Sequence, residues 1–378
     1  MQPLHRLLRI GPALVAAIIL SAAMAPATSA GAGPATARLT FGVDWDGLRI
    51  GSPCIRGLAS ASSTVGLVWK SAAGVQKART NVTAASGRGL WTYCSDSSSL
   101  AAGDVLKVDD GLGNRTFTMP KITLIADRVN DVFRGRGLAN RVTSLYYRPG
   151  LIATYYEEAE ITAAADGTWS YDPGEDLIGG IAAEITWTNA KGDWMSAVGT
   201  APYISVTLGR SRFTGGTSPS KNVNVALRDP VTAVVKGRGS AVGGDYGQFA
   251  GEFAGANGTL VKVAAGDRLV SGIASDANWI VPNIEGSANV ANDHAQGRCV
   301  DAGMSYYFAS VTVYRYGSER GFSFASPDED GAFEVDFSQP DNGYPVPYSP
   351  ANIRHGDKIV VRCWLSTGDI VGHSFLVP

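Results

Sequence analysis

The stretch Ala165-Asp-Gly-Thr-Trp-Ser-Tyr171 decides the fold, because its central pattern returns along the chain at nearly equal intervals. Asp166-Gly167 is a typical hairpin turn, and the residues after it alternate polar and aromatic side chains as a half-buried strand does. A glycine followed two positions later by an aromatic residue occurs at Gly89-Leu-Trp91, Gly167-Thr-Trp169, Gly247-Gln-Phe249 and Gly331-Ala-Phe333. We therefore interpret the chain as a fourfold internal repeat with these aromatic residues in the core.

Two further features keep the same interval. The copies open at Leu39, Ile122, Ile204 and Ile284, which are 83, 82 and 80 residues apart. A second glycine precedes a strand in each copy, at Ala102-Gly-Asp104, Ile178-Gly-Gly180, Ala265-Gly-Asp267 and His355-Gly-Asp357. These features predict four domains, at residues 31–121, 122–202, 203–283 and 284–378.

The second copy predicts the architecture most clearly. Alternating segments separated by turn residues predict seven short strands, with no helical period, at 122–126, 132–137, 142–147, 152–163, 168–171, 182–188 and 194–198. Seven short strands in about 80 residues are typical of a two-sheet sandwich of the Ig-like type. A propeller blade would have four strands in about half that length. The predicted fold class is all-β, with four tandem seven-stranded Ig-like β-sandwiches.

Two tyrosine pairs lie on predicted strands of this copy. Alternation places one tyrosine of Tyr146-Tyr147, and one of Tyr155-Tyr156, on the outward face. An exposed aromatic face could stack on sugar rings, although exposed tyrosines are also common on sheets that bind nothing.

The N-terminal residues 1–30 are interpreted as a secretory signal peptide. Positive charges at Arg6 and Arg9 precede an apolar run from Ile10 to Met24, and small residues follow it. The run is shorter than the about 20 residues of a membrane span, so an uncleaved anchor is the weaker alternative. We expect an exported protein, secreted or held at the cell surface, whose mature chain does not span a membrane.

Composition restricts the class of partner. The net charge is -2, and acidic and basic residues are spread along the chain without a basic block. This distribution disfavours nucleic acid or an anionic membrane surface as a partner. We expect a monomer that recognises a protein or a glycan at the cell surface.

Four cysteines are grouped by copy. Cys54 and Cys94 lie in the first copy, and Cys299 and Cys363 lie in the last. An even number in an exported chain predicts disulfides, for which three pairings are possible. Pairing distant copies would require the array to fold back on itself, so we predict Cys54–Cys94 and Cys299–Cys363.

The sequence contains no convincing catalytic motif. G-x-S-x-G, H-E-x-x-H, C-x-x-C and phosphate-binding glycine loops are missing, so we expect neither an enzyme nor a cofactor. In an Ig-like sandwich, the loop after the first strand and the loop before the sixth lie at one end. His294 could therefore approach His355 and Asp357 as metal ligands. Spacing alone favours the alternative, solvated loop histidines.

Several motifs together resemble bacterial Ig-like (Big) repeats. These are Ala165-Asp-Gly-Thr-Trp-Ser-Tyr171, Asp176-Leu-Ile-Gly-Gly180 and Asn189-Ala-Lys-Gly-Asp193, with Val132-Phe-Arg-Gly-Arg-Gly137 similar to the opening of such a repeat. The resemblance implies a secreted or surface-exposed array that serves as spacer, adhesin or accessory binding module, without common catalytic residues. The cysteines, and long loops in the last two copies, depart from the family pattern.

One insertion in the last copy predicts a binding loop. Residues 339–350 contain four prolines together with Tyr344 and Tyr348, a stiff and aromatic segment suited to contact. The alternative is a loop that packs over its own domain. We expect a non-enzymatic exported protein that acts in adhesion or binding through loops and sheet edges. A structural spacer or wall component is the second hypothesis, and a divergent secreted hydrolase is the third.

Overall fold

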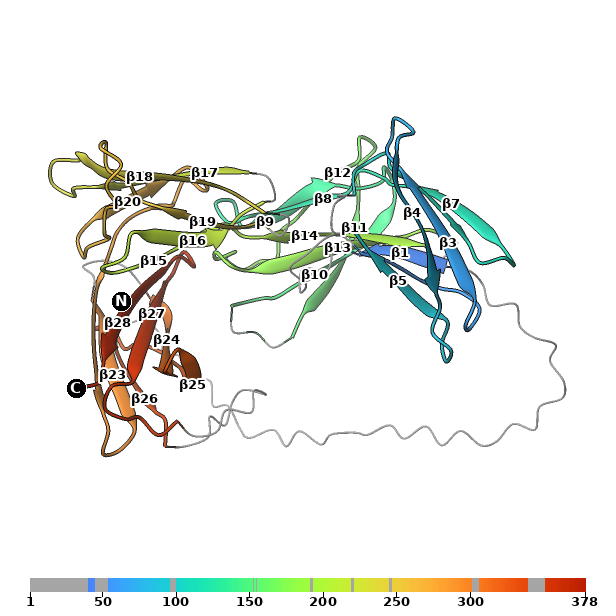
Figure 1. Cartoon of the computed structure of the whole chain (residues 1–378). Helices are drawn as coiled ribbons and strands as arrows, with labels where there is room; N and C mark the ends of the chain where they lie inside the picture. Colours follow the sequence, from blue (N-terminus) through green and yellow to red (C-terminus); the bar gives the residue numbers. More distant parts are fainter. Residues whose placement is uncertain are drawn as a thin grey trace, which may run out of the picture. The chain divides into compact units, whose positions relative to one another are not determined.

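The computed structural model describes residues 40–44, 54–95, 100–151, 153, 155–190, 193–218, 221–244, 247–300, 306–338 and 351–378. The regular elements of these residues are the strands β1 to β28, which Figure 1 labels where there is room. Within the same ranges, no helix long and apolar enough to cross a membrane is present.

The first half of the chain forms two linked sets of seven strands. The first set is β1 (Thr40–Asp44), β2 (Cys54–Leu58), β3 (Thr64–Lys70), β4 (Gln76–Thr83), β5 (Leu90–Cys94), β6 (Val105–Asp109) and β7 (Asn114–Thr118). The second set is β8 (Thr123–Asp127), β9 (Val132–Arg136), β10 (Val142–Tyr147), β11 (Glu157–Thr162), β12 (Thr168–Tyr171), β13 (Ala182–Thr188) and β14 (Trp194–Thr200). Each set has a three-stranded and a four-stranded group, ordered β1-β2-β5 and β4-β3-β6-β7, then β8-β9-β12 and β11-β10-β13-β14.

The second half repeats this arrangement. Its third set is β15 (Tyr203–Thr207), β16 (Arg212–Gly216), β17 (Asn222–Arg228), β18 (Val235–Val242), β19 (Gln248–Glu252), β20 (Arg268–Ser271) and β21 (Asn278–Ile280). Its fourth set is β22 (Asn283–Asn289), β23 (His294–Val300), β24 (Tyr306–Arg315), β25 (Ser318–Ala325), β26 (Ala332–Asp336), β27 (Lys358–Leu365) and β28 (Ile370–Leu376). The groups are β15-β16-β19 and β18-β17-β20-β21, then β22-β23-β26 and β25-β24-β27-β28. Three-plus-four strand groups are the pattern of an Ig-like sandwich, which confirms the predicted all-β class of Ig-like sandwich repeats.

Parallel pairing joins the sets two by two. β1 pairs in parallel with β14, with Gly42 opposite Trp194, and β15 pairs in parallel with β28, with Val206 opposite Val371. Each pairing merges a three-stranded and a four-stranded group into one seven-stranded sheet (Figure 1). The sequence patterns do not predict this joining, and the four domains at residues 31–121, 122–202, 203–283 and 284–378 stay a prediction.

The hydrophobic cores follow the same division. One cluster of buried side chains runs from Ile55 to Ala201, and the other runs from Ile204 to Val377. The two clusters share no residue. The buried apolar contacts that stabilise the fold are therefore organised in two units, each of which spans two seven-strand sets.

The repeated aromatic residues are buried, as predicted, and each faces a glycine on the neighbouring strand. The cross-strand pairs are Gly57–Trp91, Gly135–Trp169, Gly215–Phe249 and Gly297–Phe333. A Cβ atom at Gly215 would lie 2.4 Å from the ring of Phe249. Each facing glycine therefore leaves the space that the ring fills. Gly135, inside the predicted strand 132–137, has this structural role opposite Trp169.

The glycine that precedes each aromatic residue has a separate role. Gly89, Gly167, Gly247 and Gly331 all have positive φ, between 67° and 81°. A Cβ atom at Gly247 would lie 1.7 Å from the carbonyl oxygen of Thr217, and one at Gly331 would lie 2.2 Å from that of Cys299. Both the backbone conformation and the close packing therefore require glycine.

The glycine–aspartate step buries a carboxylate in three of the sets. Asp104, Asp267 and Asp357 are at most 3% exposed. Asp104 pairs with Lys77 at 2.8 Å, Asp267 pairs with Lys236, and Asp357 pairs with Arg315 at 2.7 Å. Each carboxylate also accepts a hydrogen bond from the backbone N–H three residues earlier. In the second set, Ile181 takes this position, so an apolar side chain replaces the ion pair.

Both predicted disulfides are present. Cys54 and Cys94 lie directly opposite each other on β2 and β5 of one sheet. Cys299 on β23 and Cys363 on β27 join the two groups of the fourth set.

The prediction of a strand from residue 152 is wrong at its start. The hairpin between β10 and β11 begins with the pair Tyr147–Glu157. Pro149 lacks a backbone N–H and ends the ladder on the β10 side. Tyr155 and Tyr156 therefore precede the strand, and both are exposed rather than alternating. In the other tyrosine pair, Tyr146-Tyr147, Tyr147 is buried and Tyr146 is half-buried on the outward face, as predicted.

Candidate functional site

The proposed loop tyrosines, Tyr344 and Tyr348, lie outside the described residues. The three candidate metal ligands lie within them, and each has a partner in the protein. His294 Nδ1 lies 2.6 Å from Glu334 Oε1, and its Nε2 lies 3.5 Å from Asp336 Oδ1. The hydrogen bond to Glu334 raises the pKa of His294. His294 is thus part of an exposed ion pair between β23 and β26.

The loops that carry the other two candidates approach β23 as expected. The carboxylate of Asp293 accepts a hydrogen bond of 2.8 Å from the N–H of Ile353. His355 contacts the carbonyl oxygen of Pro378, and Asp357 pairs with Arg315. The hydrogen bond from Arg315 holds the pKa of Asp357 below its usual value. Among the described residues, no three His, Cys, Asp or Glu side chains are grouped to hold a metal ion.

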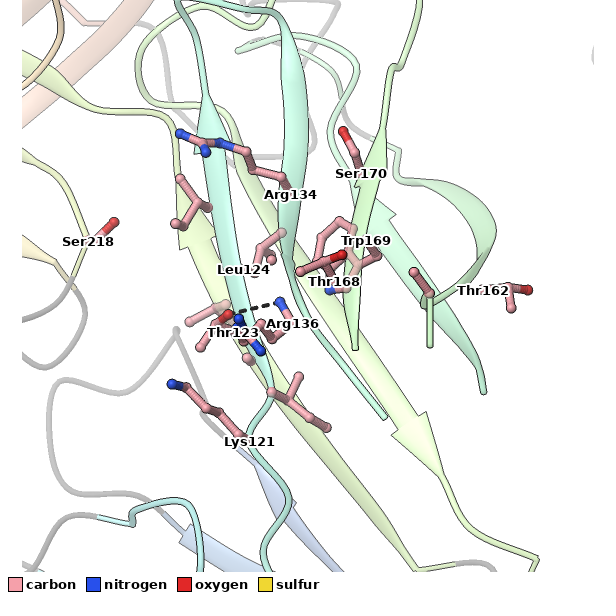
Figure 2. A pocket seen from close by; sticks show the side chains of 16 residues that line it. Lys121, Thr123, Leu124, Arg134, Arg136, Thr162, Thr168, Trp169, Ser170 and Ser218 are labelled. Atoms are coloured by element: carbon pink, nitrogen blue, oxygen red, sulfur yellow. Dashed lines mark hydrogen bonds between the residues drawn. The ribbon is translucent and has the colours of Figure 1, made fainter. Parts of the chain in front are cut away.

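A first groove, of about 1010 Å³, lies on the second set. Figure 2 shows that Arg134 and Arg136 of β9 and Lys121 border it beside Thr123, whose hydroxyl accepts a hydrogen bond from the N–H of Arg136. Arg134 pairs with Asp127 at 2.9 Å, and Arg136 donates to the carbonyl oxygen of Asp166. Two of the three cations are thus already engaged within the protein, which weakens this groove as an anion site.

A second groove, of about 850 Å³, is lined by five aromatic side chains. They are Tyr146, Tyr156, Trp194, Tyr203 and Trp364. Four of them are half-buried, and Tyr156 is exposed. Large apolar surface that is left accessible in a concave region is the usual property of a binding site. We regard this aromatic groove as the candidate functional site.

One side of the aromatic groove is the outward face of β10, β13 and β14. Tyr146, Glu184 and Val198 are directly opposite one another on these strands and form one row. The Tyr146 hydroxyl donates a hydrogen bond of 2.8 Å to Glu158 on β11, and this bond raises the pKa of Tyr146. The ring is therefore held in place on the sheet face.

The other side comes from the second half of the chain. Tyr203, Gly216 and Gln248 form a row across β15, β16 and β19. A Cβ atom at Gly216 would lie 2.6 Å from the Tyr203 ring, so the glycine lets this ring lie close to the sheet. Burial raises the pKa of Tyr203. On β27, Trp364 stacks on Phe308 with ring centroids 4.3 Å apart.

The exposed Tyr156 completes the aromatic set. Its side chain is 55% exposed, and the guanidinium of Arg148 lies 5.2 Å from the centre of its ring. The neighbouring Tyr155 is equally exposed, at 59%, but does not line the groove. The two tyrosines therefore form a matched pair for experiments.

A buried arginine connects the two sides of the groove. Arg128, in the turn between β8 and β9, pairs with Asp369 at 3.0 Å and with Asp276 at 3.0 Å. Its guanidinium also donates to the carbonyl oxygens of Pro202 and Thr367. Asp369 accepts a further hydrogen bond from the N–H of Ile204 at the start of β15. These bonds link the turn after β8, the start of β15 and the turn before β28.

Sequence reasoning identified only part of this groove. It singled out Tyr146 and Tyr156, but not Trp194, Tyr203 or Trp364. These residues lie in three different copies, and their convergence depends on how the second set lies against the third and fourth sets. The one sequence signal for the groove was that Trp194 and Tyr203 lie close together in the sequence, on either side of the predicted domain boundary at residue 202.

Comparisons with known proteins do not identify a family. No protein-family model matches the chain, and no curated protein matches it. Among solved structures, the chain is similar to a tetra-tandem repeat in the extending region of a large adhesion protein, with 14% identity over 90% of this chain and 99% of that chain, and a TM-score of 0.19. It is also similar to a bacterial ice-binding adhesin, with 15% identity, 86% and 90% coverage and a TM-score of 0.17. The chicken CNTN1 FN1-FN3 domains have 6% identity, 90% and 98% coverage and a TM-score of 0.20. At such scores these likenesses carry no argument about ligands.

Proposed function

We propose that this chain is an exported, non-enzymatic binding protein that acts in adhesion at the cell surface or in the extracellular space. The aromatic groove is the observation that carries the proposal. Five aromatic side chains from separate strands and loops converge on one concave surface and remain accessible there. Aromatic side chains supply most of the contact energy in many binding sites. The site in this proposal is a pair of sheet faces. One of them carries Tyr146, from a tyrosine pair that the sequence had also placed partly on an outward face, whereas the predicted binding function relied on loops and sheet edges.

The other parts of the proposal are consistent with this role. Two disulfides suit an oxidising extracellular compartment. The resemblance to bacterial Ig-like repeats, the signal peptide at 1–30, the four domains and the monomeric state belong to the same proposal.

A structural spacer is the second candidate function. The observation in its favour is the joining of strand sets through β1–β14 and β15–β28, together with the buried network around Arg128. Each of these contacts restricts the motion of one strand set relative to another. A spacer that transmits force requires such restriction. A spacer needs no ligand in the aromatic groove, so the two functions make different predictions for Tyr156.

Co-sedimentation with cell envelope from the producing organism tests the proposal. The mature protein should pellet saturably with the envelope, and Tyr156→Ala should weaken pelleting. Tyr155→Ala is the matched control, because it removes an equally exposed ring outside the groove and should leave pelleting unchanged. Saturable pelleting that is insensitive to Tyr156→Ala would place binding elsewhere. Absence of saturable pelleting, with the envelope or with unrelated insoluble polysaccharides, would favour the spacer.

A further inference from the structure

We propose that the aromatic groove binds a neutral oligosaccharide, with the sugar rings lying against its aromatic side chains. This inference rests on the proposed function, because it names the ligand class of the same groove. The faces of sugar rings carry C–H groups that pack on aromatic rings, while the hydroxyl groups at the ring edges form hydrogen bonds. A site for such a ligand therefore needs flat aromatic surfaces with polar groups between them.

The aromatic surfaces come from both sides of the groove. Tyr146, Tyr156 and Trp194 belong to the second set, and Tyr203 and Trp364 belong to the third and fourth sets. Tyr146 is held by Glu158, and Trp364 is held by its stack on Phe308. Rings that are already fixed lose little conformational entropy when a ligand binds.

The polar groups between the rings suit hydroxyl groups. Glu184 and Gln248 lie on the groove with the hydroxyl side chains of Thr186 and Thr200. A carboxylate accepts hydrogen bonds, a primary amide both donates and accepts, and a threonine hydroxyl does both. A volume of about 850 Å³ is within the range of ligand sites.

The charge of the lining distinguishes between kinds of glycan. Among the described side chains that line the groove there is one carboxylate, Glu184, and no lysine or arginine. A uronic acid or sulfated sugar would bring a second negative charge near Glu184, whereas a neutral sugar brings none. The lining of the first groove instead carries three cationic side chains, Lys121, Arg134 and Arg136. A neutral glycan is therefore the ligand class that fits.

Isothermal titration with soluble oligosaccharides tests the inference on the full mature chain. The panel contains neutral β-linked and α-linked glucans, galactans, mannans and chitin fragments, with matched uronic acid and sulfated chains. We expect a neutral member to bind and to change tryptophan fluorescence, because Trp194 and Trp364 line the groove. Tyr156→Ala should weaken binding about fivefold or more, whereas Tyr155→Ala should not. Glu184→Gln should weaken discrimination against acidic chains, because it removes the carboxylate of the lining.

The outcomes separate this inference from the proposed function. If only acidic chains bind, the ligand class is wrong, and if neutral binding is insensitive to Tyr156→Ala, the groove is not the glycan site; either result overturns the inference. If no glycan binds but pelleting with the envelope still depends on Tyr156, the groove recognises another chemistry: the adhesion function stands and the glycan inference fails. If neither glycan binding nor envelope pelleting depends on Tyr156, both proposals fail.

Discussion

At the residue scale, glycine explains why the repeat pattern is visible at all. Gly89, Gly167, Gly247 and Gly331 combine positive φ with a backbone carbonyl in the space where a Cβ atom would lie. L-residues other than glycine pay about 1–2 kcal/mol for the left-handed conformation even without a steric conflict. The aromatic residue that follows can vary between Trp and Phe because it only has to fill the space left by the facing glycine.

Replacement of one of these glycines should cost more than its backbone conformation alone. Gly247→Ala adds a Cβ atom 1.7 Å from the Thr217 carbonyl oxygen, whereas Gly258→Ala, at a similar φ, meets no atom within 4 Å. We expect Gly258→Ala to lower the free energy of unfolding by about 1–2 kcal/mol and Gly247→Ala by clearly more. Urea unfolding measures both, and equal losses would show that close packing contributes nothing.

The ion pair between Asp357 and Arg315 predicts a pH dependence. The folded-state pKa of Asp357 is held below its usual value by Arg315. The stabilisation is therefore complete above the unfolded-state pKa, about 3.9, and is lost as pH falls through the lower folded-state value. Arg315→Gln should cost about 1.5–3 kcal/mol at pH 7, and less at pH 3. The exposed Arg320→Gln is the control in urea unfolding at both pH values. A loss that is the same at pH 7 and pH 3 would contradict this role.

At the element scale, the parallel pairs β1–β14 and β15–β28 determine how the strand sets are grouped. They extend a three-stranded group of one set with a four-stranded group of the next. Every buried apolar residue of the two clusters lies either in the first and second strand sets or in the third and fourth strand sets. Unfolding should therefore follow two units.

Removal of one disulfide should affect only the unit that contains it. Replacing Cys299 and Cys363 by Ala should lower the stability of the 204–377 unit by about 2–5 kcal/mol and leave the 55–201 unit unchanged. Replacing Cys54 and Cys94 by Ala should do the reverse. Differential scanning calorimetry distinguishes the units as separate transitions. A single transition that shifts as a whole in both variants would show that the chain unfolds as one unit.

Local patterns predicted the elements well, and tertiary pairing explains what they missed. Alternation and turn residues located the strands of the second copy, and cysteine grouping predicted both disulfides. The start of β11 was wrong because the end of β10, at Tyr147 before Pro149, sets where the hairpin can begin. The parallel pairs were missed because a contact between β1 and β14, which are 152 residues apart at Gly42 and Trp194, leaves no local periodicity. The aromatic groove was only partly recognised for the same reason.

At the scale of the whole molecule, Arg128 joins residues that are far apart in the sequence. Its side chain is 1% exposed and pairs with the fully buried Asp369. Buried pairs contribute little net stability, but the loss of one partner leaves an uncompensated charge, which costs about 3–5 kcal/mol. The groove depends on residues from both sides of this contact, so its shape should depend on Arg128.

The substitution Arg128→Gln should weaken ligand or envelope binding although Arg128 does not line the groove. Arg136→Gln, at an exposed arginine that lines the first groove, is the control. Circular dichroism should show the strand content unchanged in both variants, and pelleting should decrease only for Arg128→Gln. Normal pelleting by a folded Arg128→Gln protein would show that the groove does not depend on this contact.

Hydrogen–deuterium exchange with and without soluble envelope fragments measures whether the aromatic groove binds them. Binding there should slow exchange in peptides that cover residues 143–160, 182–200, 203–216 and 362–370, with little change elsewhere. Protection confined to peptides that cover 339–350, around Tyr344 and Tyr348, would contradict it and would assign binding to the proline-rich segment.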